Sequence, residues 1–138
     1  MKENSLKKLL DLAKEAQKRA VTPYSSFPVG AALETRNGKI YLGCNIEVSS
    51  YGLTICAERV ALFKALSEGE TEFMRLVVTA ETIDFCPPCG ACRQVIADFA
   101  PNISIILLNS KGEVKETTIN DLFPEAFNKE FLKQIHKR

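Results

Sequence analysis

Leu76-Val77-Val78-Thr79-Ala80 and Ile103-Ser104-Ile105-Ile106-Leu107-Leu108 are two short apolar runs, separated by residues that favour a helix over 89–99. Short apolar runs rich in β-branched side chains are typical of buried strands. A strand, a helix and a second strand in this order form a crossover unit with parallel strands. This part of the chain therefore predicts an α/β fold.

A hairpin and a further helix precede this unit. The apolar segments 29–33 and 40–43 flank Asn37-Gly38, a pair that tolerates positive φ at both turn positions and so predicts a tight hairpin. Residues 56–66 are apolar and rich in good helix formers, and Gly69 can end that helix. An antiparallel hairpin joined to a parallel crossover makes the sheet mixed.

The two ends of the chain predict amphipathic helices. Apolar residues recur at helical spacing between Leu6 and Ala20, which predicts a helix that begins after Ser5 and ends before Pro23. A turn at residues 109–112 introduces a short strand, and Phe127, Phe131 and Ile135 fall four apart, as on a final helix. We expect a three-layer α/β/α sandwich with a mixed, roughly five-stranded sheet, forming a single domain over residues 1–138.

Composition excludes several classes of protein. The 138 residues are 46% hydrophobic, with 18 basic and 17 acidic side chains, so neither a disordered chain nor a protein that coats nucleic acid or membrane is expected. The N-terminal residues form no apolar signal segment, which predicts a cytoplasmic protein. Five cysteines, an odd number, disfavour a disulfide framework and point to a metal site or to catalysis.

The cysteines gather at two expected helix starts. Cys89 and Cys92 are three residues apart at the start of one helix, and Cys56 begins another. Helix N-termini favour thiolate over thiol. Three thiolates with a fourth position open form the ligand pattern of a catalytic Zn²⁺ site. Glu58 is then close enough to move a proton at the open position, and Arg59 can donate hydrogen bonds to the sulfurs.

Two other interpretations fit the same spacing. Cys89 and Cys92 could form a redox pair, or Cys86 could join the three cysteines in a closed structural zinc site. The only histidine, His136, lies near the C-terminus, so no Ser-His or Cys-His catalysis is expected.

Several motifs together resemble the cytidine deaminases, a family of zinc-dependent nucleoside deaminases. Cys56-Ala57-Glu58-Arg59 and Pro88-Cys89-Gly90-Ala91-Cys92 carry the zinc signature, in the variant with Cys in place of the first His. The likeness extends over most of residues 23–127, through three further stretches: Pro23-Tyr24-Ser25-Ser26-Phe27-Pro28-Val29-Gly30-Ala31-Ala32-Leu33, Gly43-Cys44-Asn45-Ile46-Glu47 and Leu122-Phe123-Pro124-Glu125-Ala126-Phe127.

The resemblance implies zinc-dependent hydrolytic deamination of cytidine and deoxycytidine to uridine and deoxyuridine, in pyrimidine salvage. It implies one Zn²⁺ per chain, a free nucleoside as substrate, no nucleic-acid or membrane partner, and a homotetramer. Two departures from the usual pattern, Val48 after the Asn-x-Glu triplet and Cys86-Pro87 before Pro88, lie near the expected pocket. The implied roles are zinc ligation by Cys56, Cys89 and Cys92, proton transfer by Glu58, ribose binding by Asn45 and Glu47, packing on the base by Phe27, reading of the base edge by the backbone around Cys56 and Ala57, and contact with a neighbour's pocket by Tyr51 and Phe127.

Overall fold

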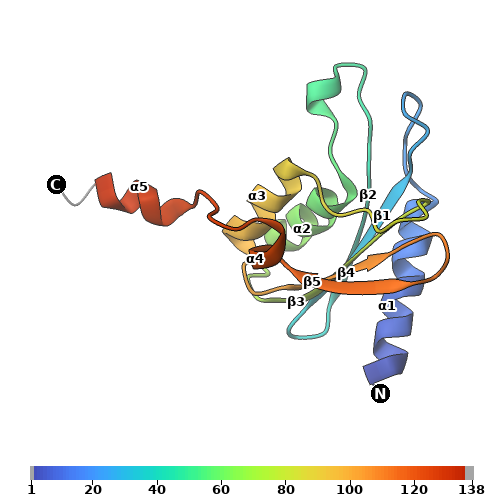
Figure 1. The fold of residues 1–138 in the computed structure, drawn as a ribbon, viewed down its shortest axis with the longest axis horizontal. Coiled ribbons are helices and arrows are strands. Elements are labelled where there is room, and N and C mark those ends of the chain that lie inside the picture. The colour runs from blue at the N-terminus through green and yellow to red at the C-terminus, as the bar shows by residue number, and fades with distance from the viewer. Residues whose placement is uncertain (1, 136–138) are drawn as a thin grey trace.

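The computed structural model describes residues 2–135 and shows a mixed five-stranded sheet with the strand order β2-β1-β3-β4-β5 (Figure 1). The strands β3 and β4 run parallel, and the three other neighbouring pairs are antiparallel. The strands are β1 (Val29–Thr35), β2 (Ile40–Cys44), β3 (Phe73–Ala80), β4 (Ser104–Leu108) and β5 (Val114–Thr118). The helices are α1 (Lys2–Gln17), the 3₁₀ helix η1 (Tyr51–Leu53), α2 (Ala57–Ser67), α3 (Gly90–Phe99), α4 (Ile119–Leu122) and α5 (Lys129–Ile135).

Helices cover both faces of the sheet. Helix α1 packs its buried Leu9 and Ala13 on one face, over Ala32 and Val77. Helices α2 and α3 cover the other face, where Leu33 and other apolar strand residues form the larger core cluster. The predicted α/β/α sandwich with a mixed sheet and a β3-α3-β4 crossover is therefore confirmed. None of the helices within residues 2–135 is long and apolar enough to cross a membrane.

The predicted hairpin between β1 and β2 is confirmed, with Asn37 and Gly38 in its turn. Of these two residues only Gly38 has a positive φ, of 88°. The backbone N–H of Gly38 donates to Thr35 O, and that of Thr35 donates to Lys39 O, which closes a three-residue loop. The buried Thr35 hydroxyl donates to the Asn37 side chain and accepts from Lys39 N. These side-chain bonds explain the wider loop.

The terminal helices also differ from their predicted bounds. Helix α1 begins at Lys2, before the predicted start after Ser5, because nothing in Glu3-Asn4-Ser5 breaks a helix. Helix α5 begins at Lys129 and leaves Phe127 in the preceding loop, although the rings of Phe127 and Phe131 stack with centroids 6.0 Å apart. This helix projects away from the sheet (Figure 1) and buries none of its residues. His136 lies outside the described residues.

Three loops meet at one end of the sheet. Val29 pairs with Ala80, and Gly30 pairs with Cys44. The start of β1 and the last residues of β2 and β3 therefore lie at the same end of the sheet. The loops before β1, after β2 and after β3 therefore lie together, and α2 and α3 both begin there (Figure 1). This end of the sheet carries the candidate site.

Candidate active site

Two helix N-termini hold the three cysteines of the predicted zinc site. Cys56 is the N-cap of α2 and Cys89 the N-cap of α3, both with extended backbone angles. Cys92 is the third residue of α3 and is buried. Pro88, itself buried, ends the preceding loop and fixes where α3 begins. Both predicted helix starts are thus confirmed.

The three sulfurs converge on one point. Their Sγ atoms all lie within 4.8 Å of one another, and those of Cys56 and Cys89 are 3.6 Å apart. A tetrahedral zinc with Zn–S bonds of about 2.3 Å needs sulfurs about 3.8 Å apart. Among residues 2–135 no fourth histidine, cysteine or carboxylate joins this group, and Cys86 is not part of it. The donor set fits Zn²⁺ with one position left for a ligand from outside the chain.

The surroundings of the cluster favour thiolate. Hydrogen bonds from the Cys92 thiol and from Arg59 lower the pKa of Cys56 from 9.0 to about 5, against the opposing effect of burial. The Arg59 contact joins Nη2 to Cys56 Sγ over 3.4 Å, as the sequence predicted. Cys86 differs, because burial raises the pKa of its thiol. A positive group beside three thiolates offsets the excess negative charge that they bring to a divalent ion.

Glu58 lies in the first turn of α2, two residues after Cys56. Its side chain is 5% exposed, and this burial raises the pKa of the carboxyl to about 7, with a further contribution from the negative charge of Cys56. A carboxyl group with a pKa near neutrality can both accept and return a proton at physiological pH. Its position and its pKa suit proton transfer.

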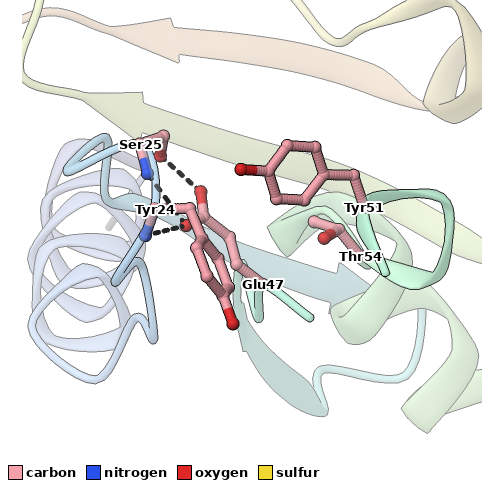
Figure 2. Close-up of a pocket in the computed structure, with 5 residues that line it drawn as sticks. All are labelled: Tyr24, Ser25, Glu47, Tyr51 and Thr54. Atoms are coloured by element: carbon pink, nitrogen blue, oxygen red, sulfur yellow. Dashed lines mark hydrogen bonds between the residues drawn. The ribbon is translucent and has the colours of Figure 1, made fainter. Parts of the chain in front are cut away.

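A pocket of about 300 Å³ is lined by Tyr24, Ser25, Glu47, Tyr51 and Thr54. Figure 2 shows Glu47 joined to the Tyr24-Ser25 turn, with Tyr51 and Thr54 on the opposite side. The rings of Tyr24 and Tyr51 are tilted by 59° with centroids 5.5 Å apart. Tyr51 therefore lines a pocket of its own chain while remaining 71% exposed.

Glu47 and Asn45 hold the loop that enters β1. The Glu47 carboxylate accepts hydrogen bonds from Tyr24 N at 3.0 Å, from Ser25 N at 3.1 Å and from the Ser25 hydroxyl. These bonds lower the pKa of Glu47, and the bond from the Ser25 hydroxyl has the largest effect. The carboxyl group of Glu47 is therefore ionised at neutral pH. Asn45 accepts from Val29 N at 2.9 Å and donates to Phe27 O at 2.8 Å. Both side chains thus position the loop that carries Phe27.

An antiparallel bridge between Ile46 and Ile55 joins the pocket to the cysteines. Through this pairing, the segment that carries Asn45 and Glu47 runs beside the segment that carries Thr54 and Cys56. Two residues along an extended chain span roughly 7 Å. The pocket and the sulfur cluster are therefore neighbouring parts of one site.

The remaining predicted residues lie in different places. Ala57 is fully buried at the start of α2, and Phe27 is 40% exposed in the loop before β1. Phe127 is not among the residues that line the pocket of its own chain; its carbonyl accepts a hydrogen bond from Gln94. Sequence reasoning assigned no role to Ser25, whose hydroxyl donates to Glu47 and accepts from Phe27 N. Ser25 and Glu47 are 22 residues apart, and no sequence pattern indicates that they are in contact.

Arg93 is a second residue whose structural role the sequence reasoning missed. It follows Cys92, and its guanidinium donates to Pro88 O at 2.8 Å and to Leu122 O at 2.5 Å. It thereby joins the first turn of α3 to the end of α4. The segment that carries Cys89 and Cys92 is thus bonded to a distant part of the chain.

Known proteins share both the sequence and the fold. Residues 3–108 match the family model described as the cytidine and deoxycytidylate deaminase zinc-binding region. The cytidine deaminase of Sporosarcina psychrophila is 52% identical over 128 residues, which cover 92% of this chain and 94% of that protein. The blasticidin-S deaminase of Bacillus cereus is 33% identical over 109 residues, which cover 73% of this chain and 77% of that protein.

The solved structures agree with these sequence matches. A 1.6 Å crystal structure of the cytidine deaminase from Burkholderia pseudomallei has a TM-score of 0.84 to this chain at 48% identity. The alignment covers 86% of this chain and 96% of that one. The chain belongs to the cytidine and deoxycytidylate deaminase family.

Proposed function

We propose that this protein is a zinc-dependent deaminase that converts cytidine and deoxycytidine, with water, to uridine and deoxyuridine and ammonia. One observation carries the proposal. Three cysteine sulfurs come together at two helix N-termini, and the buried Glu58 carboxyl lies two residues along the chain from Cys56. A structural zinc site has four protein ligands, so it leaves no open position at which a buried carboxyl group could transfer a proton. The family membership supports the same reaction.

In this proposal, Cys56, Cys89 and Cys92 hold one zinc ion, and Arg59 stabilises the thiolates. Zinc, when bound, supplies the Lewis acidity that makes water nucleophilic near neutral pH. Glu58 accepts the proton of the attacking water and passes it to N3 of the pyrimidine. Once the water oxygen has bonded to C4, Glu58 accepts the second proton from that new hydroxyl group and transfers it to the exocyclic amine. The protonated amine then leaves as ammonia while the C4 oxygen becomes a carbonyl. The pKa of about 7 suits both transfers.

The substrate is oriented by groups on both sides of the cluster. Asn45 and Glu47 bind the sugar hydroxyl with the hydrogen-bonding capacity that the loop contacts leave free. Phe27 packs against the pyrimidine ring, and backbone groups around Cys56 and Ala57 bind the edge of the base. The ionised state of Glu47 and its position beside Tyr24 and Tyr51 support a site for a polar sugar rather than for a free base.

The cellular setting belongs to the same proposal. We place the protein in the cytoplasm, in pyrimidine salvage, because a site built from three thiolates needs a reducing compartment. We also propose that residues 1–138 form one domain, supported by the continuous sheet, and that four chains assemble with shared active sites. Phe127, which is 55% exposed, then reaches the pocket of a neighbouring chain, and the exposed face of Tyr51 contacts a neighbour from its place at the pocket of its own chain.

The test is to mix the purified zinc-loaded protein with cytidine and to follow the loss of its ultraviolet band together with the release of ammonia. We expect both signals in parallel for cytidine and deoxycytidine. Turnover of cytosine, blasticidin S or single-stranded DNA at a higher kcat/KM would assign another substrate. Bound zinc without turnover of any of these would favour a structural site, and reversible thiol oxidation without turnover would favour a redox pair.

A further inference from the structure

Strand β2 approaches helix α2 closely at Gly43. A Cβ atom built on Gly43 would lie 2.2 Å from Ala57 O and 2.6 Å from Ala61 N, both backbone atoms of α2. Ordinary contacts of a Cβ atom begin at 3.4 Å, and no side-chain rotation can relieve a clash with backbone. The helix axis is therefore held against the strand at a distance that only glycine allows.

This contact lies at the start of the helix, where the site is. Ala57 stands between Cys56, the N-cap of α2, and Glu58. Ala57 and Ala61 are both fully buried and present small side chains to the strand one turn apart. Lys64 ties the other end of α2 to the same strand by donating to Leu42 O. The contact at Gly43 therefore sets how far Cys56 and Glu58 stand from the sheet.

From this geometry we infer that Gly43 is a positioning residue for zinc and for proton transfer, acting through the first turn of α2. The inference rests on the proposed function for what the site does, but the metal geometry can be measured without it. Helix α3 brings Cys89 and Cys92 from a separate element, so a movement of α2 alone changes the spacing of the sulfurs. Relief of the clash at Ala57 O requires a shift of about 1 Å, and a misplacement of that size can lower a rate about 100-fold.

The chain offers a matched control in the same hairpin. A Cβ atom on Gly30 would lie 2.1 Å from Ala13 O and 2.5 Å from Gln17 N, which is an equal clash against the backbone of α1. Helix α1 lies on the opposite face of the sheet and contributes neither a cysteine of the cluster nor a residue of the pocket. Gly30→Ala therefore perturbs the packing of a helix that carries no cysteine of the cluster and has no contact with the first turn of α2 through this glycine.

The experiment compares Gly43→Ala with Gly30→Ala in the holoenzyme and in the cobalt-substituted protein. We expect both variants to melt at lower temperature than the parent protein. Gly43→Ala alone should release zinc faster to a chelator, change the visible cobalt–thiolate spectrum and lose about 10- to 100-fold in kcat with a smaller change in KM. Equal zinc release and identical cobalt spectra in the two variants would overturn the inference.

A second pair of variants covers the case in which Gly43→Ala does not fold. Ala61→Val adds bulk to the same contact from the helix side, since the Ala61 Cβ lies 3.1 Å from the position of the added atom. Ala65→Val adds the same bulk one turn further from the cysteines. We expect faster zinc release and a changed cobalt spectrum only in Ala61→Val, and indistinguishable variants would refute the positioning role. If the parent protein failed to deaminate cytidine, the proposed function would fall, while the zinc and cobalt measurements would still decide the role of Gly43.

Discussion

Glu58 is deeply buried and lies two residues after Cys56, one of the proposed zinc ligands. Gln has almost the same shape and cannot shuttle a proton, so Glu58→Gln should retain the fold and one zinc per chain. The loss of a general acid–base group costs about 10²–10⁴ in rate. We expect kcat for cytidine to fall by at least that range, measured from the ultraviolet band, with zinc content determined on the same sample. Near-normal turnover would show that another group carries the proton.

Cys86 is the residue that distinguishes the catalytic from the structural zinc site. It stands outside the sulfur cluster, before Pro87-Pro88, and burial raises the pKa of its thiol. Cys86→Ser should therefore bind one zinc per chain and remain active, whereas Cys89→Ser should lose metal and activity together. Zinc stoichiometry measured beside deamination decides this, and loss of zinc from the Cys86 variant would contradict the assignment.

Glu47 tests recognition of the sugar. The variant Glu47→Gln removes the charge that a ribose hydroxyl would meet, so kcat/KM for cytidine should fall by about 10- to 100-fold while slow turnover of cytosine stays unchanged. Because Glu47 also holds Tyr24 and Ser25, the control is Ser25→Ala, which removes one of these loop contacts and keeps the carboxylate. A larger effect from Ser25→Ala than from Glu47→Gln would mean that loop order, not sugar binding, is the function of Glu47.

At the scale of one element, helix α2 depends on a glycine just after its end. Gly69 has a φ of +91°, its N–H donates to Leu66 O, and no atom within 4 Å would meet an added Cβ. The cost of Gly69→Ala is therefore backbone strain alone, about 1 kcal/mol, or a few degrees in Tm, with kcat unchanged. Thermal unfolding against Gly52→Ala, which also meets no atom but has no positive φ, measures this cost. Equal melting temperatures would contradict the strain argument.

Individual elements show what the sequence could predict and what it could not. Apolar periodicity and the cysteine spacing placed the crossover, the hairpin and both helix N-termini, since these depend on local pattern. The three-residue loop of the β1–β2 hairpin was not predicted in this detail, because it depends on hydrogen bonds that the buried Thr35 hydroxyl makes within the loop. The bonds of Asn45 and Glu47 to the loop before β1 join residues 16 to 23 positions apart, and no periodic pattern encodes such contacts.

The proximity of Gly43 to α2 belongs to the same class. From the sequence alone, a glycine in a strand indicates only a residue with low strand propensity. The three-dimensional structure shows that backbone atoms of α2 occupy the space that a side chain at Gly43 would need. The C-terminal apolar spacing likewise predicted an amphipathic helix, but it could not show which surface the apolar side of that helix contacts. Helix α5 buries none of its residues, so no other element within residues 2–135 covers it.

At the scale of the whole molecule, this uncovered helix bears on assembly. Phe127, Phe131, Leu132 and Ile135 are each at least half exposed, and the segment that carries them projects from the body (Figure 1). An apolar surface of this kind on a small protein marks an interaction site. We expect light scattering to give four times the mass of one 15.3 kDa chain, and a fully active monomer would contradict this.

The proposal that neighbouring chains share their active sites can be tested more directly than by measuring the molecular mass. If Phe127 completes the pocket of a neighbour, Phe127→Ala should lower kcat/KM without loss of zinc. Co-expression of differently tagged Glu58→Gln and Phe127→Ala chains should then give hybrid tetramers with more activity than either variant alone. The reason is that some sites combine an intact Glu58 from one chain with an intact Phe127 from the other. If Phe127 served only its own chain, each site would lack one of the two groups, and the hybrids would show no more than the average of the parent variants.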